Sequence, residues 1–257
     1  MKSSRDITKD PTDNGIRVIG RAAQILNALS KHIDGLTLGE IALQVNLPRS
    51  TVQRIVQALD HENLVIAASL ASGVRLGPAL LALAASVKQF SIVEYAHPLL
   101  AQLSKDTGET VDLAILGNDK AVIVDTMYST YPLVAVSGLG SSRPLHSSAS
   151  GKALLAALPR ERYDQLKKHL CLSAVTRNTI TDWHTFDREI ETVRHTGMAF
   201  DDEEYALGIS ALSVAVHGPG DEFAAIAMPV PTERFRETKD RLAKALVERA
   251  KTFERCL

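Results

Sequence analysis

The amino-acid sequence predicts a protein of two domains, in which a small helical domain precedes a larger domain of the α+β or α/β class. Its 257 residues exceed the usual size of one small domain. Apolar residues recur at helical spacing before residue 60, and later strand-like runs are interleaved with helical ones. Hydrophobic residues make up 45% and charged residues 23%, which is ordinary for a globular protein and allows a sizeable core.

The start of the chain is polar and has no apolar secretory segment, so we expect residues 1–13 to form a disordered arm. No apolar stretch reaches membrane-spanning length without charge. Cys171 and Cys256 are far apart and form no CxxC pair, so neither a disulfide framework nor a thiolate metal site is expected. These observations favour a cytoplasmic protein that needs no metal, cofactor or membrane.

Three helices are expected in the first domain. The first covers Val18–Leu29. Thr37 starts a short second helix, because Glu40 three residues later completes a capping-box pattern. Asn46-Leu47 forms a tight turn, and Pro48 suits the first turn of a third helix. One face of this third helix is apolar and is expected to be buried: Val52, Ile55, Val56 and Leu59.

Two β-prone pieces follow, Leu64–Ala67 and Val74–Leu76, and they predict a hairpin with a flexible tip. After Gly77-Pro78, the segment Ala79–Phe90 predicts a helix that is apolar on more than one face and needs a partner to cover it. We therefore expect a helix-and-hairpin domain at 14–77, a linker helix at 78–91 and a larger domain at 92–257.

Helix, short helix, tight turn, helix and hairpin is the plan of a winged helix-turn-helix, whose third helix enters the major groove of DNA. An arginine there binds guanine or phosphate, and a glutamine pairs with adenine. Hydroxyls at the helix start donate to phosphate, and arginines elsewhere hold the flanking backbone or the minor groove. The candidate DNA contacts are Arg17, Arg21, Thr37, Pro48, Arg49, Ser50, Thr51, Gln53, Arg54 and Arg75.

Charge alone does not decide this point, because the whole chain has a net charge of −1. Residues 14–77 carry six basic and four acidic side chains, a small positive excess. The alternative is that these arginines are solvated faces of a helical module that binds only proteins. The ordered succession of elements favours double-stranded DNA as the partner.

The larger domain is expected to mix strands and helices. Pro98 begins or bends a helix that ends near Gly108. The strand-like runs are Val111–Leu116, Ala121–Thr126, Leu133–Ser137, Met198–Phe200, Ile209–Val216 and Phe223–Val230. The helical runs are Gly151–Ala157, Arg160–His169, Trp183–His195 and a long helix from about Thr232. Such an order predicts a sheet backed by helices.

The segment Leu145–Lys152 is a loop of small polar residues that runs into a helix. Small residues let a ligand approach the backbone, and free N–H groups at a helix start favour an anion such as a carboxylate. A phosphate-binding P-loop is excluded, because His146 and Ala153 stand where Gly and Ser or Thr are needed. His146 is either a ligand contact or a structural histidine.

The run Asp201-Asp202-Glu203-Glu204 is either a metal site or a solvated turn. Four adjacent acids point in different directions, which favours the solvated turn. Trp183 is expected to pack in the core. We find no nucleophile–base pair, no metal-ligand spacing and no nucleotide fingerprint in the sequence, so an enzyme is not expected.

The motifs in these segments, taken in order, strongly resemble the IclR family of bacterial regulators over residues 16–255. They are GLTLGEIALQVNLPRSTVQRIVQALDHENLV, GVRLGPALLALA, GETVDLAIL, RPLHSSASGKALLAALP, TRNTITDWHTFDREIETVRHTGMAFDDEEYALGISALSVAV and FAAIAMPVPTERF. The resemblance implies an α+β fold with a winged helix-turn-helix, a dimerising linker helix and a GAF-like effector-binding domain. It also implies a regulator that binds operators as a dimer or a dimer of dimers and responds to small carboxylates or aromatic compounds. We expect a repressor of a catabolic or transport operon.

The effector site that the resemblance and the loop together indicate consists of His146, Ala149, Ser150, Gly151, Asp201, Ala211, Ala227, Met228 and Pro229. Asp201 enters only through the resemblance. Many members present Cys or Ser on the cavity strands, whereas the matching positions here are Ala211, Ala227 and Pro229. This departure predicts a less polar pocket. We therefore expect an effector with an apolar or aromatic body and one carboxylate at the Ser150–Gly151 helix start.

Overall fold

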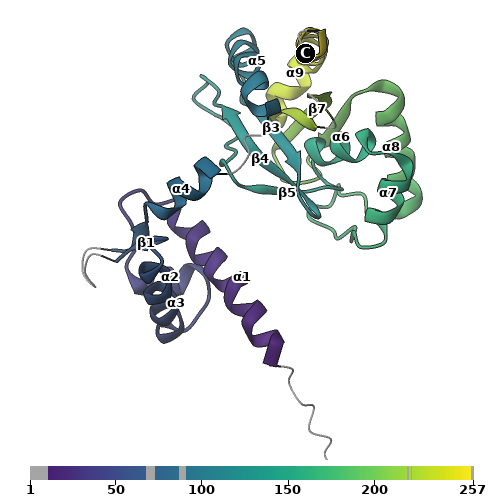
Figure 1. Ribbon diagram of the computed structural model, residues 1–257. Helices are drawn as coiled ribbons and strands as arrows, with labels where there is room; N and C mark the ends of the chain where they lie inside the picture. Colours follow the sequence, from purple (N-terminus) through teal and green to yellow (C-terminus); the bar gives the residue numbers. More distant parts are fainter. Residues whose placement is uncertain (1–10, 68–72, 87–90, 219, 221, 256–257) are drawn as a thin grey trace, which may run out of the picture. The chain divides into compact units, whose positions relative to one another are not determined.

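The computed structural model describes residues 11–67, 73–86, 91–218, 220 and 222–255, and the chain divides into two compact units after residue 88 (Figure 1). Three expectations fall partly outside the described residues: the arm over residues 1–10, the hairpin tip at 68–72, and the end of the linker helix at 87–90. In the described ranges, no helix has both the length and the apolar character needed to cross a membrane.

The first unit has the predicted order of elements. Its elements are α1 (Pro11–Leu29), α2 (Leu38–Gln44), α3 (Arg49–His61), β1 (Val65–Ile66), β2 (Arg75–Leu76) and α4 (Ala79–Ser86). α1 begins at Pro11, inside the range that we expected to be disordered. β1 and β2 pair antiparallel as a hairpin. Ile25 of α1, Ile41 of α2 and Val52 of α3 are fully buried together and hold the three helices to one another.

Local sequence sets the ends of these helices. Thr37 is the N-cap of α2, where its hydroxyl accepts from the Glu40 backbone N–H while the Glu40 carboxylate accepts from the Thr37 N–H. These bonds lower the pKa of Glu40. Asn46 adopts a positive φ of 51° between α2 and α3, as a tight turn requires. The helix-turn-helix geometry therefore follows from the predicted capping box and turn.

The second unit contains a six-stranded antiparallel sheet with the strand order β5-β4-β3-β8-β7-β6. The strands are β3 (Val111–Leu116), β4 (Lys120–Met127), β5 (Ser142–Pro144), β6 (Ala199–Asp202), β7 (Ile209–His217) and β8 (Phe223–Pro231). The helices are α5 (Ser91–Thr107), α6 (Ala149–Ala157), α7 (Arg160–Lys167), α8 (Trp183–Thr196) and α9 (Thr232–Arg255). Pro98 lies inside α5 rather than at its start. Antiparallel pairing places the unit in the α+β class.

Helices cover both faces of this sheet (Figure 1). α5 and α9 pack on one face, against side chains such as Leu113, Leu212 and Ile226. α6, α7 and α8 pack on the other, against Ala114 and Ala225. Successive strand residues belong to opposite cores because side chains alternate along a strand. This alternation decides which residues of β7 and β8 can reach a ligand.

The prediction of a strand over residues 133–137 is wrong. The segment has no strand partner, and the edge strand beside β4 is β5 instead. Burial nevertheless alternates along it, with Ala135 and Ser137 buried while Leu133 and Val136 are exposed. The alternation that indicated a strand thus reflects an extended segment that lines a cavity rather than a sheet.

Candidate DNA-binding face and effector cavity

The exposed face of α3 carries the predicted base-reading side chains. Arg49, Ser50, Gln53 and Arg54 are exposed, and Thr51 is half-buried. The predicted apolar stripe of the same helix is buried, as expected. Pro48 precedes the helix as its N-cap residue and makes no side-chain cap. We call this exposed surface of α3 the DNA-binding face.

Two grooves beside α3 bring other predicted contacts together. Arg21 of α1 lines one groove with Thr51 and Arg54 of α3. Thr37 lines the other with Gln53, next to the hairpin residue Gly73. The groupings match a surface that follows a duplex with helix and wing together. Arg17 and Arg75 are exposed on α1 and β2 but line neither groove.

A cavity of about 340 Å³ lies in the second unit, between the sheet, the start of α6 and the extended segment 134–137. Its apolar lining consists of Ile123, Val134, Ala135, Val136, Ala206, Ile209, Ala211, Ala227 and Pro229. Its polar lining consists of Asp112, Ser137, Arg143, Ser148, Ser150, Asp201 and Tyr205. The volume and the mostly apolar walls suit one small organic molecule.

Five of the nine predicted effector contacts line this cavity: Ser150, Asp201, Ala211, Ala227 and Pro229. The structure therefore brings together the helix start, β6 and the two adjacent strands β7 and β8. Ala211 and Pro229 face each other in the strand register, which closes this wall with small apolar groups. Ala211, Ala227 and Pro229 thus give this part of the lining small apolar groups.

The other four predicted contacts do not line the cavity. His146 is buried, and its Nε2 lies 2.9 Å from the carbonyl oxygen of Ser173. Met228 follows Ala227 on the strand and so packs in the core on the opposite face of the sheet. Ala149 is buried in the first turn of α6. These positions were wrongly assigned because the sequence does not show which way each side chain of a loop or strand points.

Gly151 has a structural role instead of a ligand contact. A Cβ atom at this position would lie 2.5 Å from the backbone oxygen of Leu145. Its N–H donates to the hydroxyl of Ser148, the N-cap residue of α6, at 3.1 Å. The Ser148 hydroxyl in turn donates to the Pro144 carbonyl at 2.6 Å. Glycine is thus needed for the close approach of the loop and helix rather than for ligand access.

Arg143 is a cavity residue that sequence reasoning missed, although it stands at the start of the RPLHSS motif. Its guanidinium lies 5.0 Å from the centre of the Tyr205 ring, which also lines the cavity. Its Nη1 donates to the Ser141 hydroxyl at 3.3 Å. Among the described residues, no carboxylate lies within ion-pair distance of Arg143. It therefore offers a positive charge to an anion in the cavity.

Asp112 is a second missed residue, buried on β3 at the cavity wall. Burial raises the pKa of its carboxyl, while hydrogen bonds with Ser137 and Thr126 oppose that rise. The Thr126 hydroxyl donates to Asp112 at 2.6 Å. These bonds satisfy the acid from within the protein and hold the extended segment at Ser137 against the sheet.

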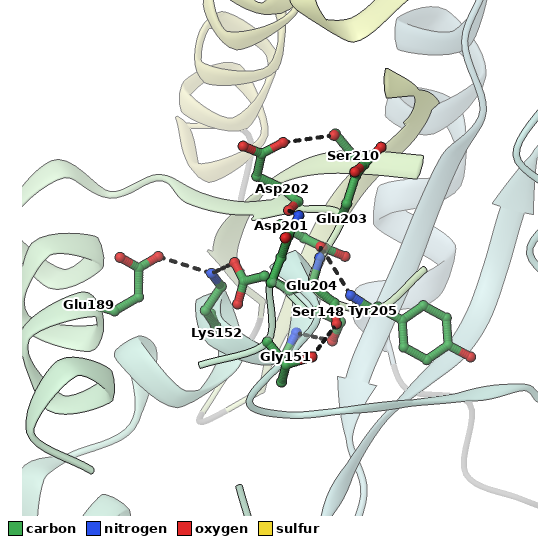
Figure 2. Close-up of polar contacts among 12 residues, drawn as sticks. Ser148, Gly151, Lys152, Glu189, Asp201, Asp202, Glu203, Glu204, Tyr205 and Ser210 are labelled. Carbon is green, nitrogen blue, oxygen red and sulfur yellow. Dashed lines mark hydrogen bonds and ion pairs between the residues drawn. The ribbon is translucent and has the colours of Figure 1, made fainter. Parts of the chain in front are cut away.

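The interpretation of residues 201–204 as a solvated turn is wrong for two of its four acids. Asp201 and Glu204 are buried, whereas Asp202 is exposed. Figure 2 shows Asp202 directed to Ser210 while Asp201 points to the other side. Alternation along β6 separates the two aspartates, and the chain then bends at Glu203, whose φ is 57°. Strand β6 and the turn after it thus place two acids, Asp201 and Glu204, in the interior.

Glu204 forms a buried ion pair with Lys152 of α6, and the partly exposed Glu189 of α8 also contacts this lysine (Figure 2). The Lys152 Nζ lies 2.6 Å from Glu204 Oε1 and 3.0 Å from Glu189 Oε1. Burial raises the pKa of Glu204, and Lys152 opposes the rise. No sequence signal connects these residues except the lysine of the SGK motif, because they are far apart in the chain.

Within the described part of the chain, no group of three or more His, Cys, Asp or Glu side chains is arranged to hold a metal ion. Trp183 is half-buried and packs edge-on against Phe186 at 5.8 Å between ring centres, a core contact as expected. The cavity of the second unit, with its apolar walls and few polar groups, can bind a small molecule.

Comparisons with known proteins agree with both units. The IclR helix-turn-helix domain matches residues 18–66, and the bacterial transcriptional regulator IclR C-terminal domain matches residues 84–255. HTH-type transcriptional regulator Rv1719 of Mycobacterium tuberculosis is 41% identical over 93% of this chain and 92% of its own. Transcriptional repressor IclR of Escherichia coli is 28% identical over 91% of this chain and 86% of its own.

 A further relative, the acetate operon repressor of Salmonella typhimurium, is also 28% identical, over 92% of this chain and 87% of its own length.

One solved structure shares the fold over nearly the whole chain. It is an IclR homologue from Microbacterium hydrocarbonoxydans in complex with 4-hydroxybenzoate, with a TM-score of 0.72 and 21% identity over 93% of this chain and 100% of that one. Matches to both domains, together with the M. tuberculosis relative, identify the relationship. This chain belongs to the IclR family of DNA-binding bacterial transcriptional regulators.

Proposed function

We propose that this protein is a cytoplasmic repressor of a catabolic or transport operon, and that a small aromatic acid controls its binding to the operator. Two of the relatives named above are repressors, which supports repression. The cavity in the second unit supports control by a small molecule. The base-reading side chains are those of the DNA-binding face of α3.

The residues that line the cavity are the reason for proposing an aromatic acid as the effector. Its walls are mainly apolar and suit an aromatic ring, while Arg143 supplies a positive charge. The hydroxyls of Ser148 and Ser150 stand at the start of α6, where the helix dipole favours a carboxylate. A keto acid of two or three carbons would leave most of the apolar wall uncovered. The 4-hydroxybenzoate bound by the M. hydrocarbonoxydans protein belongs to the class we propose.

Calorimetric titration of the full-length protein tests the effector class. Benzoate and 4-hydroxybenzoate are expected to bind more tightly than glyoxylate and pyruvate. Arg143→Gln should weaken 4-hydroxybenzoate about tenfold or more, since a hydrogen bond to a charged group is worth about 1.5–3 kcal/mol. The neutral 4-hydroxybenzyl alcohol is the matched control, and its affinity should change little. Tight binding of only the small keto acids would overturn the aromatic assignment.

A gel shift with the DNA upstream of the protein's own gene tests control of operator binding. We expect binding that weakens with salt, because phosphate contacts release counterions, and that changes when 4-hydroxybenzoate is added. A protein-only scaffold would show no such binding. If the protein binds this DNA but no aromatic acid changes the binding, the proposed effector class is wrong.

We further propose that the regulator acts as a dimer or a dimer of dimers joined through α4. Leu81 of this helix is 76% exposed, and Ala82 and Ala84 are exposed beside it. An apolar helix whose described side chains are largely exposed is a typical association surface. The effector would then shift the balance between assemblies that do and do not match the operator half-sites.

A further inference from the structure

At and behind the polar end of the cavity, acidic side chains outnumber the buried cation Lys152. Asp201 lines the cavity, and its Oδ1 accepts from the backbone N–H of Glu204 at 2.7 Å and of Tyr205 at 3.3 Å. Glu204 lies behind it and pairs with Lys152, which also pairs with Glu189 (Figure 2). When all are ionised, Glu204 and Glu189 contact the one ammonium group, and Asp201 adds a third negative charge near them.

This arrangement leaves one carboxylate oxygen unsatisfied. Oε2 of Glu204 is buried and has no hydrogen-bond partner among the described residues. A buried carboxylate oxygen without a partner is costly, and so is a second negative charge beside it. An effector carboxylate placed near Ser150 would add a further negative charge to this wall.

We propose that the effector carboxylate binds this wall together with one proton, which Asp201 takes up from solution. The protonated Asp201 then donates its O–H to the effector and adds no negative charge beside it. The inference rests on the proposed function, because it requires a carboxylate effector. Burial, and the neighbouring Glu204, raise the pKa of Asp201 to about 7, so the proton is available near neutral pH.

Several elements contribute groups near Asp201. α6 contributes Lys152, α8 contributes Glu189 through that lysine, and β7 contributes only Ser210 and Ala211 at the paired positions. The other charged or titratable groups of the turn and the cavity are Asp202, Glu203, Glu204, Tyr205, Arg143 and Asp112. Arg143 attracts the effector but leaves the acids at this end in excess, so a bound anion increases the proton affinity of Asp201.

Calorimetry of the full-length protein with 4-hydroxybenzoate measures the proton directly. The observed enthalpy is compared at pH 8 in buffers of different ionisation enthalpy, and the slope gives the number of protons taken up. We expect about one proton per site at pH 8, where a carboxyl of this pKa is mostly ionised without ligand, and close to none at pH 5.5. The neutral 4-hydroxybenzamide should take up none at either pH.

Two variants locate the proton. Asp201→Asn keeps an oxygen to accept the backbone N–H groups but cannot titrate, and we expect it to abolish uptake. Asp202→Asn, on the exposed side of β6, should leave uptake unchanged. Binding of the acid without uptake in the natural protein overturns this inference alone, and uptake that persists in Asp201→Asn overturns the assignment to Asp201. Failure of every aromatic acid to bind overturns the proposed effector class and this inference with it.

Discussion

The ammonium nitrogen of Lys152 lies 2.6 Å from Oε1 of Glu204, and both side chains are buried. The pair joins α6 to the turn after β6, next to the cavity wall formed by Asp201. A buried ion pair costs desolvation, and removing one partner leaves the other charge uncompensated. This contact therefore links the stability of the effector domain to the geometry of its binding site.

Lys152→Met should destabilise the protein by about 3–5 kcal/mol at pH 8, measured by urea denaturation at fixed protein concentration. The loss should be smaller at pH 5, where Glu204 can hold a proton. The double variant Lys152→Met/Glu204→Gln should recover part of the loss. Lys167→Met removes a half-exposed ion pair with Asp187 and should cost no more than about 1 kcal/mol. Equal losses in the two lysine variants would contradict the buried-pair argument.

Asp201→Asn should flatten the dependence of stability on pH. The pKa of Asp201 is about 7 in the fold against an ordinary value of 3.8, so the folded protein holds a proton that the unfolded chain releases between these values. The stabilisation of the fold by this proton is fully present below pH 3.8 and is lost as the pH rises towards 7. Between pH 5 and 8 the natural protein should lose about 2–3 kcal/mol more than the variant. Parallel pH profiles would show that Asp201 is ionised throughout.

Gly151→Ala should destabilise the second unit by at least about 2 kcal/mol, because its Cβ would meet the Leu145 backbone at 2.5 Å. Gly20→Ala is the matched control on α1, where a Cβ would meet nothing within 4 Å. That exchange should stabilise the helix by up to about 1 kcal/mol. Thermal melting of both variants compares the two effects. A Gly151→Ala protein as stable as the natural one would mean that the loop and helix can move apart.

Arg54→Ala should weaken operator binding by about 1–3 kcal/mol and relax specificity at one base position, if the guanidinium reads a base. Fluorescence anisotropy with single-base operator variants measures both effects. Arg160→Ala, at a 70% exposed side chain on α7 of the other unit, is the control and should leave DNA affinity unchanged. A uniform loss over all sequences would instead assign Arg54 to phosphate.

Leu81→Glu should dissociate the assembly, because it places a charge on the most exposed apolar side chain described on α4. Light scattering at several protein concentrations measures the mass. Ile33→Glu is the matched control, since Ile33 is 93% exposed in the loop after α1. An unchanged mass in Leu81→Glu would remove α4 from the interface.

Local sequence was sufficient to predict most of the helices and strands. The apolar stripe of α3, the Thr37–Glu40 capping box and the turn at Asn46 depend on residues a few positions apart. The same holds for β3, whose predicted and observed bounds coincide. Burial of such patterns follows from periodicity alone, because side-chain direction repeats every 3.6 residues in a helix and every two in a strand.

Only the tertiary structure decided how these elements form the candidate site. Burial alternates along residues 133–137 as in a strand, yet the segment lines a cavity, because pairing depends on which strand lies beside β4. Ala227 reaches that cavity while its neighbour Met228 faces the opposite core. Lys152 and Glu204 meet across 52 positions of the chain. The sequence by itself determined the family, the helix-turn-helix and the succession of strands and helices, whereas the fold decided which charges and small residues share one wall, because such contacts arise between segments that no local pattern connects.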